Sequence, residues 1–151
     1  MTTTRIRNAL LLLIVLATGA LIVLFLRSRA LDGVVSYGDD TQIEVSVADT
    51  PALREEGLSG TNRLPEGVGK LFVFDTPGMY GFWMKDMQYS IDIVWIDAAW
   101  QVVGVTPGLA PETYPTIFYP PKAVLYVLEV PEGSTGVDKL TVGTQLTWTA
   151  R

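Results

Sequence analysis

The chain has 151 residues, the length of a single domain, and it contains neither cysteine nor histidine. Disulfides, thiol nucleophiles, Cys/His zinc sites and histidine-based triads are therefore excluded. Four of the 11 basic residues flank an N-terminal apolar segment, so the chain from Leu31 onward holds seven basic and all 16 acidic residues, a net charge of −9. That charge predicts no nucleic-acid partner, because nucleic-acid binding depends on neutralising phosphates.

Residues 9–26 form an uncharged apolar segment, which predicts a transmembrane helix. As a helix this segment measures about 27 Å, just enough to cross the hydrocarbon core of a bilayer. A cleaved signal peptide is the alternative, with Ser28-Arg29-Ala30 as its small-x-small site, but the apolar core is long for one. We expect an uncleaved, single-pass signal anchor in the cell membrane, with residues 1–8 as a cytoplasmic tail, 27–40 as a linker and 41–151 as an extracytoplasmic domain.

The first half of this domain predicts two strands and a short helix. Residues 41–47 alternate apolar and polar side chains, as a half-buried strand does. Thr50 is placed as the N-cap of a helix that begins at Pro51 and is ended by Gly57. After a turn-rich loop, residues 71–74 form an apolar run that is too short for a helix and predicts a buried strand.

The second half predicts the remaining strands and one long loop. Strands are expected at 79–84, 91–96, 100–105, 123–130 and 144–148, with one or two helical turns at 134–140. The segment 106–121 contains five prolines, which exclude a helix or a central strand there. About seven short strands with one or two short helices predict a mainly β fold, a small β-barrel or sandwich, preceded by one N-terminal transmembrane helix.

Several segments between residues 41 and 148 match a known family in order and spacing. The most specific block is Phe82-Trp83-Met84-Lys85 followed by Ile91-Asp92-Ile93. The others are Arg54-Glu55-Glu56-Gly57-Leu58-Ser59, Gly69-Lys70-Leu71-Phe72-Val73-Phe74 and Tyr126-Val127-Leu128-Glu129-Val130-Pro131. Together they resemble the DUF192 (UPF0127) family. The resemblance implies a compact β-barrel-like or sandwich fold, and it implies no particular biochemical activity.

Four charged residues within and after the most specific block are candidate ligand-binding groups: Lys85, Asp86, Asp92 and Asp97. Asp92 lies among apolar residues of a predicted strand, so its carboxylate needs a hydrogen bond or an ion-pair partner. It either binds a ligand at a cleft or supports the fold, by capping a loop amide or pairing with Lys85. A metal site from Asp86, Asp92 and Asp97 is less favoured, because their spacing matches no calcium loop. We expect no metal ion and no cofactor.

Aromatic residues extend the predicted cleft. Trp83 lies beside Lys85 in the sequence, and Tyr114, Phe118 and Tyr119 belong to the proline-rich loop. A proline-stiffened aromatic loop is a suitable contact surface for a peptide or a glycan. The same rings are equally suited to covering an open end of a barrel. The predicted cleft therefore lies near Trp83, Lys85 and Asp92, with Tyr114 and Tyr119 at its rim.

The favoured function is a binding or accessory module for a small ligand, a peptide or an envelope component, with no catalytic residue assigned. The alternative is an envelope hydrolase or transferase that acts on glycans or peptides through carboxylate or lysine chemistry. In that case Ser59 or Ser90 would pair with Lys70 or Lys85. An assembly factor for a membrane complex, which would dock through the predicted anchor, is a third possibility.

Overall fold

The computed structural model describes residues 31–151 apart from Asp39 and Thr135. The predicted anchor at 9–26 and the predicted tail at 1–8 lie outside the described residues. Within residues 31–151, with the same two gaps, no helix has the length and apolar character needed to span a membrane.

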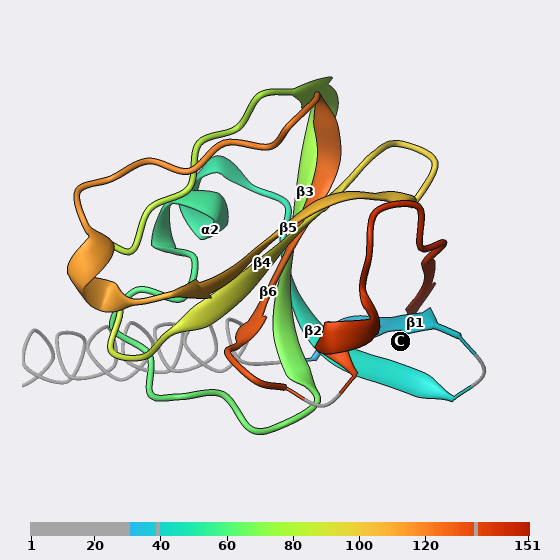
Figure 1. The fold of residues 1–151 in the computed structure, drawn as a ribbon, viewed down its shortest axis with the longest axis horizontal. Coiled ribbons are helices and arrows are strands. Elements are labelled where there is room, and N and C mark those ends of the chain that lie inside the picture. The colour runs from blue at the N-terminus through green and yellow to red at the C-terminus, as the bar shows by residue number, and fades with distance from the viewer. Residues whose placement is uncertain (1–30, 39, 135) are drawn as a thin grey trace, which may run out of the picture. The chain divides into compact units, whose positions relative to one another are not determined.

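Seven strands, one α-helix and two 3-10 turns make up the described part of the chain (Figure 1). The strands are β1 Gly33–Tyr37, β2 Thr41–Ala48, β3 Val68–Gly78, β4 Ile91–Ile96, β5 Val102–Leu109, β6 Val124–Pro131 and β7 Thr147–Ala150. The helical elements are α2 Pro51–Glu56, η1 Pro111–Thr113 and η2 Val137–Lys139. The predicted mainly β fold with few helical residues is confirmed.

The strands form one curled sheet in the order β5-β4-β6-β3-β2-β1-β7. All neighbours are antiparallel except β2 and β3, which are parallel and are connected by the crossover that contains α2. The two ends of the sheet meet, because the amide of Leu146 donates to the carbonyl of Trp100 and the amide of Val102 donates to that of Thr144, both at 2.9 Å. A single curled sheet with joined ends resembles a small barrel more than a two-sheet sandwich.

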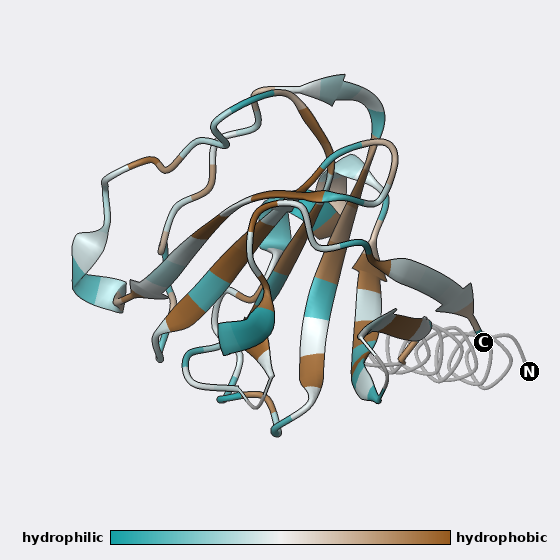
Figure 2. Cartoon of the chain, turned by 45° about the vertical axis from the view of Figure 1, so that its right-hand side comes forward, coloured by the Kyte–Doolittle hydropathy of each residue, from teal (hydrophilic) through white to brown (hydrophobic). Residues whose placement is uncertain are grey.

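Both faces of the central strands are buried. All six residues of β4 are buried, including Asp92, and the other five are apolar. Val94 and Ile96 belong to an inner core that gathers residues from β1 through to β5 and therefore lies inside the curl. Ile91, Ile93 and Trp95 belong to an outer core on the opposite face. Figure 2 shows hydrophobic residues recurring along the strands that separate the two cores.

Helix α2 and an irregular segment cover the outer core. Helix α2 contributes Leu53, and residues 79–90, here called the covering segment, contribute Phe82, Met84 and Tyr89. The predicted helix cap is confirmed, since the Thr50 hydroxyl accepts a hydrogen bond from the Leu53 amide at 3.3 Å. These elements turn one face of an ordinary antiparallel sheet into a second buried layer.

Two predicted segments differ from the structure in their secondary structure. Residues 79–84 are not a strand, because they pair with the rest of the chain only through an isolated bridge between Phe82 and Phe118. Alternating burial of Phe82 and Met84 over the outer core produced the strand-like pattern. The predicted linker 27–40 contains β1, whose Val35 and Tyr37 are buried in the inner core.

Two strands also extend beyond the ends that the sequence predicted. Strand β5 continues to Leu109 and includes Pro107, although residues 106–121 were predicted as a loop. Proline is tolerated there because β5 is the last strand in the sheet order, where a missing amide breaks no ladder bond. Strand β3 likewise continues through Asp75 to Gly78, with a register irregularity against β6 after Val73.

Candidate functional site

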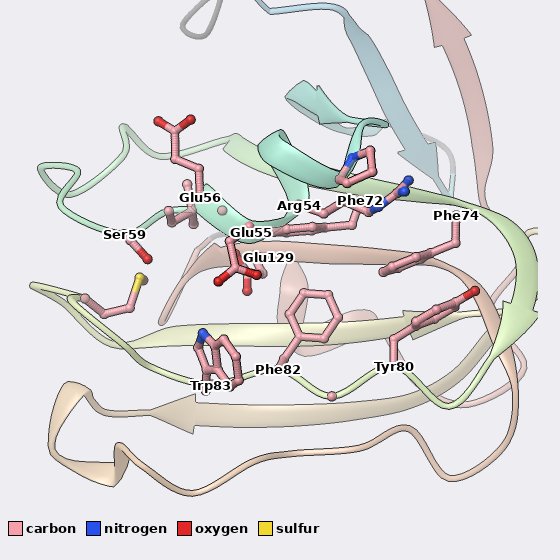
Figure 3. A pocket seen from close by; sticks show the side chains of 15 residues that line it. Arg54, Glu55, Glu56, Ser59, Phe72, Phe74, Tyr80, Phe82, Trp83 and Glu129 are labelled. Atoms are coloured by element: carbon pink, nitrogen blue, oxygen red, sulfur yellow. The ribbon is translucent and has the colours of Figure 1, made fainter.

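A pocket of about 220 Å³ opens on the outer face, between α2 and the covering segment (Figure 3). Helix α2 and the residues after it place Arg54, Glu55, Glu56 and Ser59 on one side. The covering segment places Tyr80, Phe82 and Trp83 on the other. Phe72 and Phe74 of β3 and Glu129 of β6 form the floor. The pocket therefore combines an aromatic wall with three carboxyl groups and one guanidinium.

The aromatic wall is organised by ring contacts that exist without a ligand. Phe82 meets Phe72 edge to face at a centroid distance of 4.9 Å and Trp95 at 5.5 Å. Phe74 is stacked on Tyr80 at 3.5 Å. The edge-to-face contacts of Phe82 are a geometry that aromatic quadrupoles favour, whereas Phe74 and Tyr80 lie nearly face to face. Trp83 differs from its neighbours because 41% of its surface is exposed at the mouth of the pocket, so its ring is available for contact.

Arg54 is committed to the fold. One terminal nitrogen of its guanidinium donates to the carbonyl of Asp49 at 2.8 Å and to that of Val73 at 2.7 Å. The group also lies 5.2 Å from the ring centroid of Phe74 and 3.7 Å from the exposed carboxylate of Asp75. These contacts fasten α2 to β2 and β3. Arg54 therefore shapes one side of the pocket with one terminal nitrogen bound to backbone carbonyls and the other near Asp75.

Glu129 is the most unusual residue of the pocket. It lies on β6, opposite Lys70 of β3 and Ile93 of β4, and only 5% of its surface is exposed. Its carboxyl group reaches the pocket between α2 and the rings of Phe82 and Trp83 (Figure 3). Among the residues that the structure describes, none forms a hydrogen bond to this carboxyl or an ion pair with it within 4.0 Å.

Burial dominates the ionisation of this carboxyl. Loss of solvent raises the pKa of Glu129 from 4.5 to about 8, and the positive charge of Lys70 acts in the opposite direction. The same burial lowers the pKa of Lys70, against the attraction of Glu56, Glu129 and Asp32. At neutral pH the Glu129 carboxyl is therefore mostly protonated, a state that is common at functional sites.

Glu129 was quoted in the sequence only as part of a family segment, and Lys70 was considered as a site residue only as a partner of serine in the hydrolase alternative. The signal was present, since Glu129 is the one acidic residue in the otherwise apolar run at 123–131. A charged residue on a strand that is buried on both faces has no solvent to reach and should be treated as a candidate site. Lys70 carries the same signal on β3.

Among the residues predicted for the cleft, Trp83 lines the pocket and Lys85 and Asp86 do not. Lys85 and Asp86 are exposed in a turn of the covering segment, and Asp86 has a positive φ of 56°. Their backbone carbonyls accept hydrogen bonds from the Ser59 hydroxyl at 2.9 Å and from the Gly60 amide at 2.8 Å. This turn therefore holds the loop that follows α2.

Asp92 lies on the opposite face of β4 from the pocket. Its carboxylate accepts a hydrogen bond from the amide of Gly108 at 2.7 Å, at a point where Gly108 has a φ of +63°. It also lines a wider and more open hollow of about 660 Å³ next to Glu132 and Asp138. The contact with a loop amide is the structural role considered for Asp92, and the pairing with Lys85 is absent. Trp83, Lys85 and Asp92 therefore do not form one cleft.

Asp97 organises the tight turn between β4 and β5. One carboxylate oxygen accepts hydrogen bonds from the amides of Ala99 and Gln101, each at 3.0 Å, and Lys122 lies 3.5 Å from the other oxygen. These bonds support Trp100 at a φ of +60°, a left-handed conformation that is strained for a residue with a side chain. Asp86, Asp92 and Asp97 lie apart, and the described residues contain no acidic cluster suited to a metal ion.

The proline-rich loop covers the outer core and also presents aromatic rings to solvent. Phe118 packs against the outer core, and its backbone exchanges hydrogen bonds with Phe82 at 2.8 and 2.9 Å. Tyr114 and Tyr119 are exposed and do not line the pocket. The Tyr119 side chain approaches Gly81, where a Cβ atom would lie 3.0 Å from its ring. Both predicted roles of this loop therefore have a structural counterpart.

Replacing Asp92 by alanine is expected to lower the free energy of unfolding by about 1–2 kcal/mol, because the partly buried amide of Gly108 loses its acceptor. Asp92→Asn keeps an oxygen acceptor and should cost less. Thermal melts of the full chain measure both effects. Unchanged melting of Asp92→Ala would remove the structural role, and a change in ligand binding at the Trp83 pocket would contradict its placement on the other face.

Comparisons with known proteins agree with this architecture. The sequence profile of the DUF192 family, described as Uncharacterized ACR, matches residues 34–148. No curated protein matches the chain. A proposed transcription regulator from Sinorhizobium meliloti 1021 is similar in fold, with a TM-score of 0.72 and 23% identity over 78% of this chain and 93% of that one. A protein of unknown function from Novosphingobium aromaticivorans DSM 12444 is also similar in fold. Its TM-score is 0.70, and its sequence is 22% identical over 76% of this chain and 84% of that one.

Proposed function

We propose that this chain, which belongs to the DUF192 family, is a membrane-anchored, extracytoplasmic binding module. It holds a small ligand, or a segment of a peptide or envelope component, in the pocket between α2 and the covering segment. The anchor at 9–26 is the part of this proposal that rests on the sequence pattern alone. The observation that carries the binding function is the Glu129 carboxyl on the floor of an aromatic pocket, which has no hydrogen-bond or ion-pair partner among the described residues.

Two properties of the pocket support a binding function. It is concave, and it combines an aromatic wall with a few polar and charged side chains that can fix the orientation of a ligand. Its aromatic wall is rigid before any ligand arrives, so little conformational freedom is lost on binding. A buried carboxyl without a partner costs stability, and a bound ligand would offset that cost.

A hydrolase is the second candidate, and one observation favours it. A carboxyl group that is protonated at neutral pH is what a general acid requires, and Glu129 meets that condition. Serine–lysine chemistry has less support, because the Ser59 hydroxyl donates to the Lys85 backbone and the Lys85 side chain lies outside the pocket. Turnover of chromogenic glycosides or peptides that is lost in Glu129→Gln, with binding retained, would favour the enzyme.

Binding is tested by saturation-transfer NMR with the full chain, recovered in detergent from alkaline-washed membranes. Three fragment sets, one neutral, one anionic and one cationic, serve as probes. Fragments held by the pocket should lose at least about tenfold in affinity in Trp83→Ala, because an exposed tryptophan at a pocket mouth is a typical binding hot spot. Tyr114→Ala is the matched control, since Tyr114 is equally exposed but lies outside the pocket.

Two outcomes would overturn parts of this proposal. If no fragment of any charge gives a signal that depends on Trp83, the pocket is not a binding site. If the chain does not remain in the membrane pellet after the alkaline wash, the anchor is removed from the proposal while the binding function is still tested on the recovered protein.

A further inference from the structure

We propose that the group held by this pocket is a primary ammonium on an apolar stem, paired with the Glu129 carboxylate and enclosed by the rings of Phe82 and Trp83. The inference deepens the proposed function and rests on it. It assigns a chemical class of ligand, an organic amine, and a role to each side of the pocket.

The charges around the pocket favour a cation. Glu55, Glu56 and Glu129 line it, and the one basic side chain among its lining residues is Arg54. Arg54 already donates to two backbone carbonyls and lies against Asp75, so it is poorly placed to receive an anion. The chain from Leu31 onward is itself strongly acidic. An anionic ligand would approach the acidic side chains of Glu55 and Glu56, which would repel it.

The geometry favours an ammonium group with a stem over a bare inorganic ion. The described residues provide no acidic cluster for a metal, and the walls that adjoin Glu129 are aromatic rings. An ammonium near aromatic faces is attracted by their electron density, and this attraction is stronger where water is excluded. A primary ammonium also has three N–H donors, which suit carboxyl oxygens that have no other partner. The apolar stem would pack along Phe82 and Trp83 toward solvent.

Other titratable groups surround Glu129. Lys70 of β3 and Tyr89 of the covering segment interact with its charge, and β4 places Ile93 opposite it. Arg54, Glu55 and Glu56 of α2 and Tyr80 of the covering segment line the same pocket. Lys70 is the internal competitor for Glu129, because it carries the same kind of cation. It forms no ion pair with Glu129 within 4.0 Å and does not line the pocket, so the open side of the carboxyl remains for a ligand.

Binding of this ligand releases a proton. The free pocket presents Glu129 as a carboxylic acid at neutral pH, because burial raises its pKa to about 8. When the ammonium enters, the carboxyl gives its proton to solvent and becomes the carboxylate of an ion pair. The ammonium keeps all its protons and no bond of the ligand breaks. Neutral ligands would bind the protonated carboxyl with no such release, so proton release identifies the class.

Calorimetric titration of the full chain with n-butylammonium chloride tests the inference. In buffers of different ionisation enthalpy at pH 7, about 0.9 proton should be released per bound ligand. The dissociation constant should fall about tenfold between pH 7 and pH 9, where the ammonium is still protonated and Glu129 is already ionised. Titration with n-butanol, the neutral isostere, should show at least about tenfold weaker binding.

Two variants make the test specific. Glu129→Gln should abolish both the proton release and the pH dependence, and it should weaken binding at pH 9 by at least about tenfold. Trp83→Ala should weaken the binding of n-butylammonium while leaving the proton release per bound ligand unchanged, and its exposed position makes loss of folding unexpected.

Nα-acetyl-lysine methylamide is the second probe. Tighter binding than n-butylammonium assigns the amine to a lysine side chain of a peptide, and weaker binding assigns it to a free amine.

Equal binding of n-butanol and n-butylammonium, or amine binding without proton release, would overturn the inference. If n-butylammonium does not bind while a neutral or anionic fragment still depends on Trp83, the ligand class is wrong and the binding function stands. If the binding of no probe depends on Trp83, both the amine inference and the proposed binding function fail.

Discussion

Replacing Glu129 by glutamine is expected to stabilise the folded chain by about 4 kcal/mol at pH 8 and to change its stability little near pH 4. The wild-type carboxyl has an ordinary pKa of 4.5 when unfolded and a pKa of about 8 when folded. Between these values the folded state binds more protons than the unfolded state, so the free energy of unfolding falls as pH rises. Each unit of difference is worth about 1.4 kcal/mol. Glutamine has the size of the protonated carboxyl and stays neutral, so the variant does not pass through the loss of stability that ionising Glu129 causes.

The direction in which the free energy of unfolding changes with pH distinguishes Glu129 from its neighbour Lys70. The pKa of Lys70 is lowered in the fold, so its contribution to stability rises with pH between its folded pKa and its ordinary value of 10.5. The two groups therefore act with opposite signs, and a free energy of unfolding that falls between pH 4.5 and 8 reports Glu129. Urea unfolding of the full chain at pH 4, 6 and 8 measures the difference. Glu112→Gln, at an exposed position on η1, is the matched control.

Parallel stability curves for the wild type and Glu129→Gln across this range would show that the carboxyl ionises freely in the fold. They would also remove the basis for linked proton release on amine binding. A stability gain for Glu112→Gln of similar size would instead assign the effect to the overall acidity of the chain.

Phe82→Ala is expected to lower the free energy of unfolding by about 3–5 kcal/mol, the usual cost of deleting a buried aromatic ring. Phe82 is 9% exposed and contacts the rings of Phe72, Phe74 and Trp95. Its backbone also holds the proline-rich loop through Phe118. Removing the ring therefore opens a cavity in the outer core and loosens the covering segment at the same time.

The neighbouring residue is the control for this variant. Trp83 is a larger ring but lies at the surface, so Trp83→Ala should change the free energy of unfolding by about 0.5 kcal/mol or less. Chemical unfolding and fragment binding, both measured on Phe82→Ala and Trp83→Ala, should give opposite patterns. Phe82→Ala should lose stability, whereas Trp83→Ala should keep stability and lose ligand affinity. Equal losses of stability would mean that the covering segment folds as one unit and that Trp83 is part of its support.

Local patterns were sufficient where an element is decided by its own residues. The alternation at 41–47 predicted β2, the Thr50-Pro51 pair predicted the start of α2, and the apolar run at 71–74 predicted a buried strand that is part of β3. Each of these signals acts within a few residues, so no distant contact was needed to interpret it.

Pairing between distant segments was beyond these patterns. Strand β1 was taken for a linker because its partners are β2 and β7, and Gly33 lies opposite Ala150 at the other end of the chain. Residues 79–84 were taken for a strand because alternating burial over the outer core imitates a strand. In both cases the secondary structure depends on which distant segment pairs with the residues concerned, and a local sequence pattern does not identify that segment.

The sequence by itself determined the mainly β class, the family resemblance and the need of Asp92 for a partner, since all three depend on composition and short-range order. Only the tertiary structure decided which acidic residue forms the candidate site. A period of two places Asp92 on one face of β4, and pairing with β6 places Glu129 on the other, under α2 and the covering segment. Desolvation depends on everything that covers a carboxyl group. Asp92 found the amide of Gly108, whereas Glu129 was left buried, unpartnered and open to the pocket.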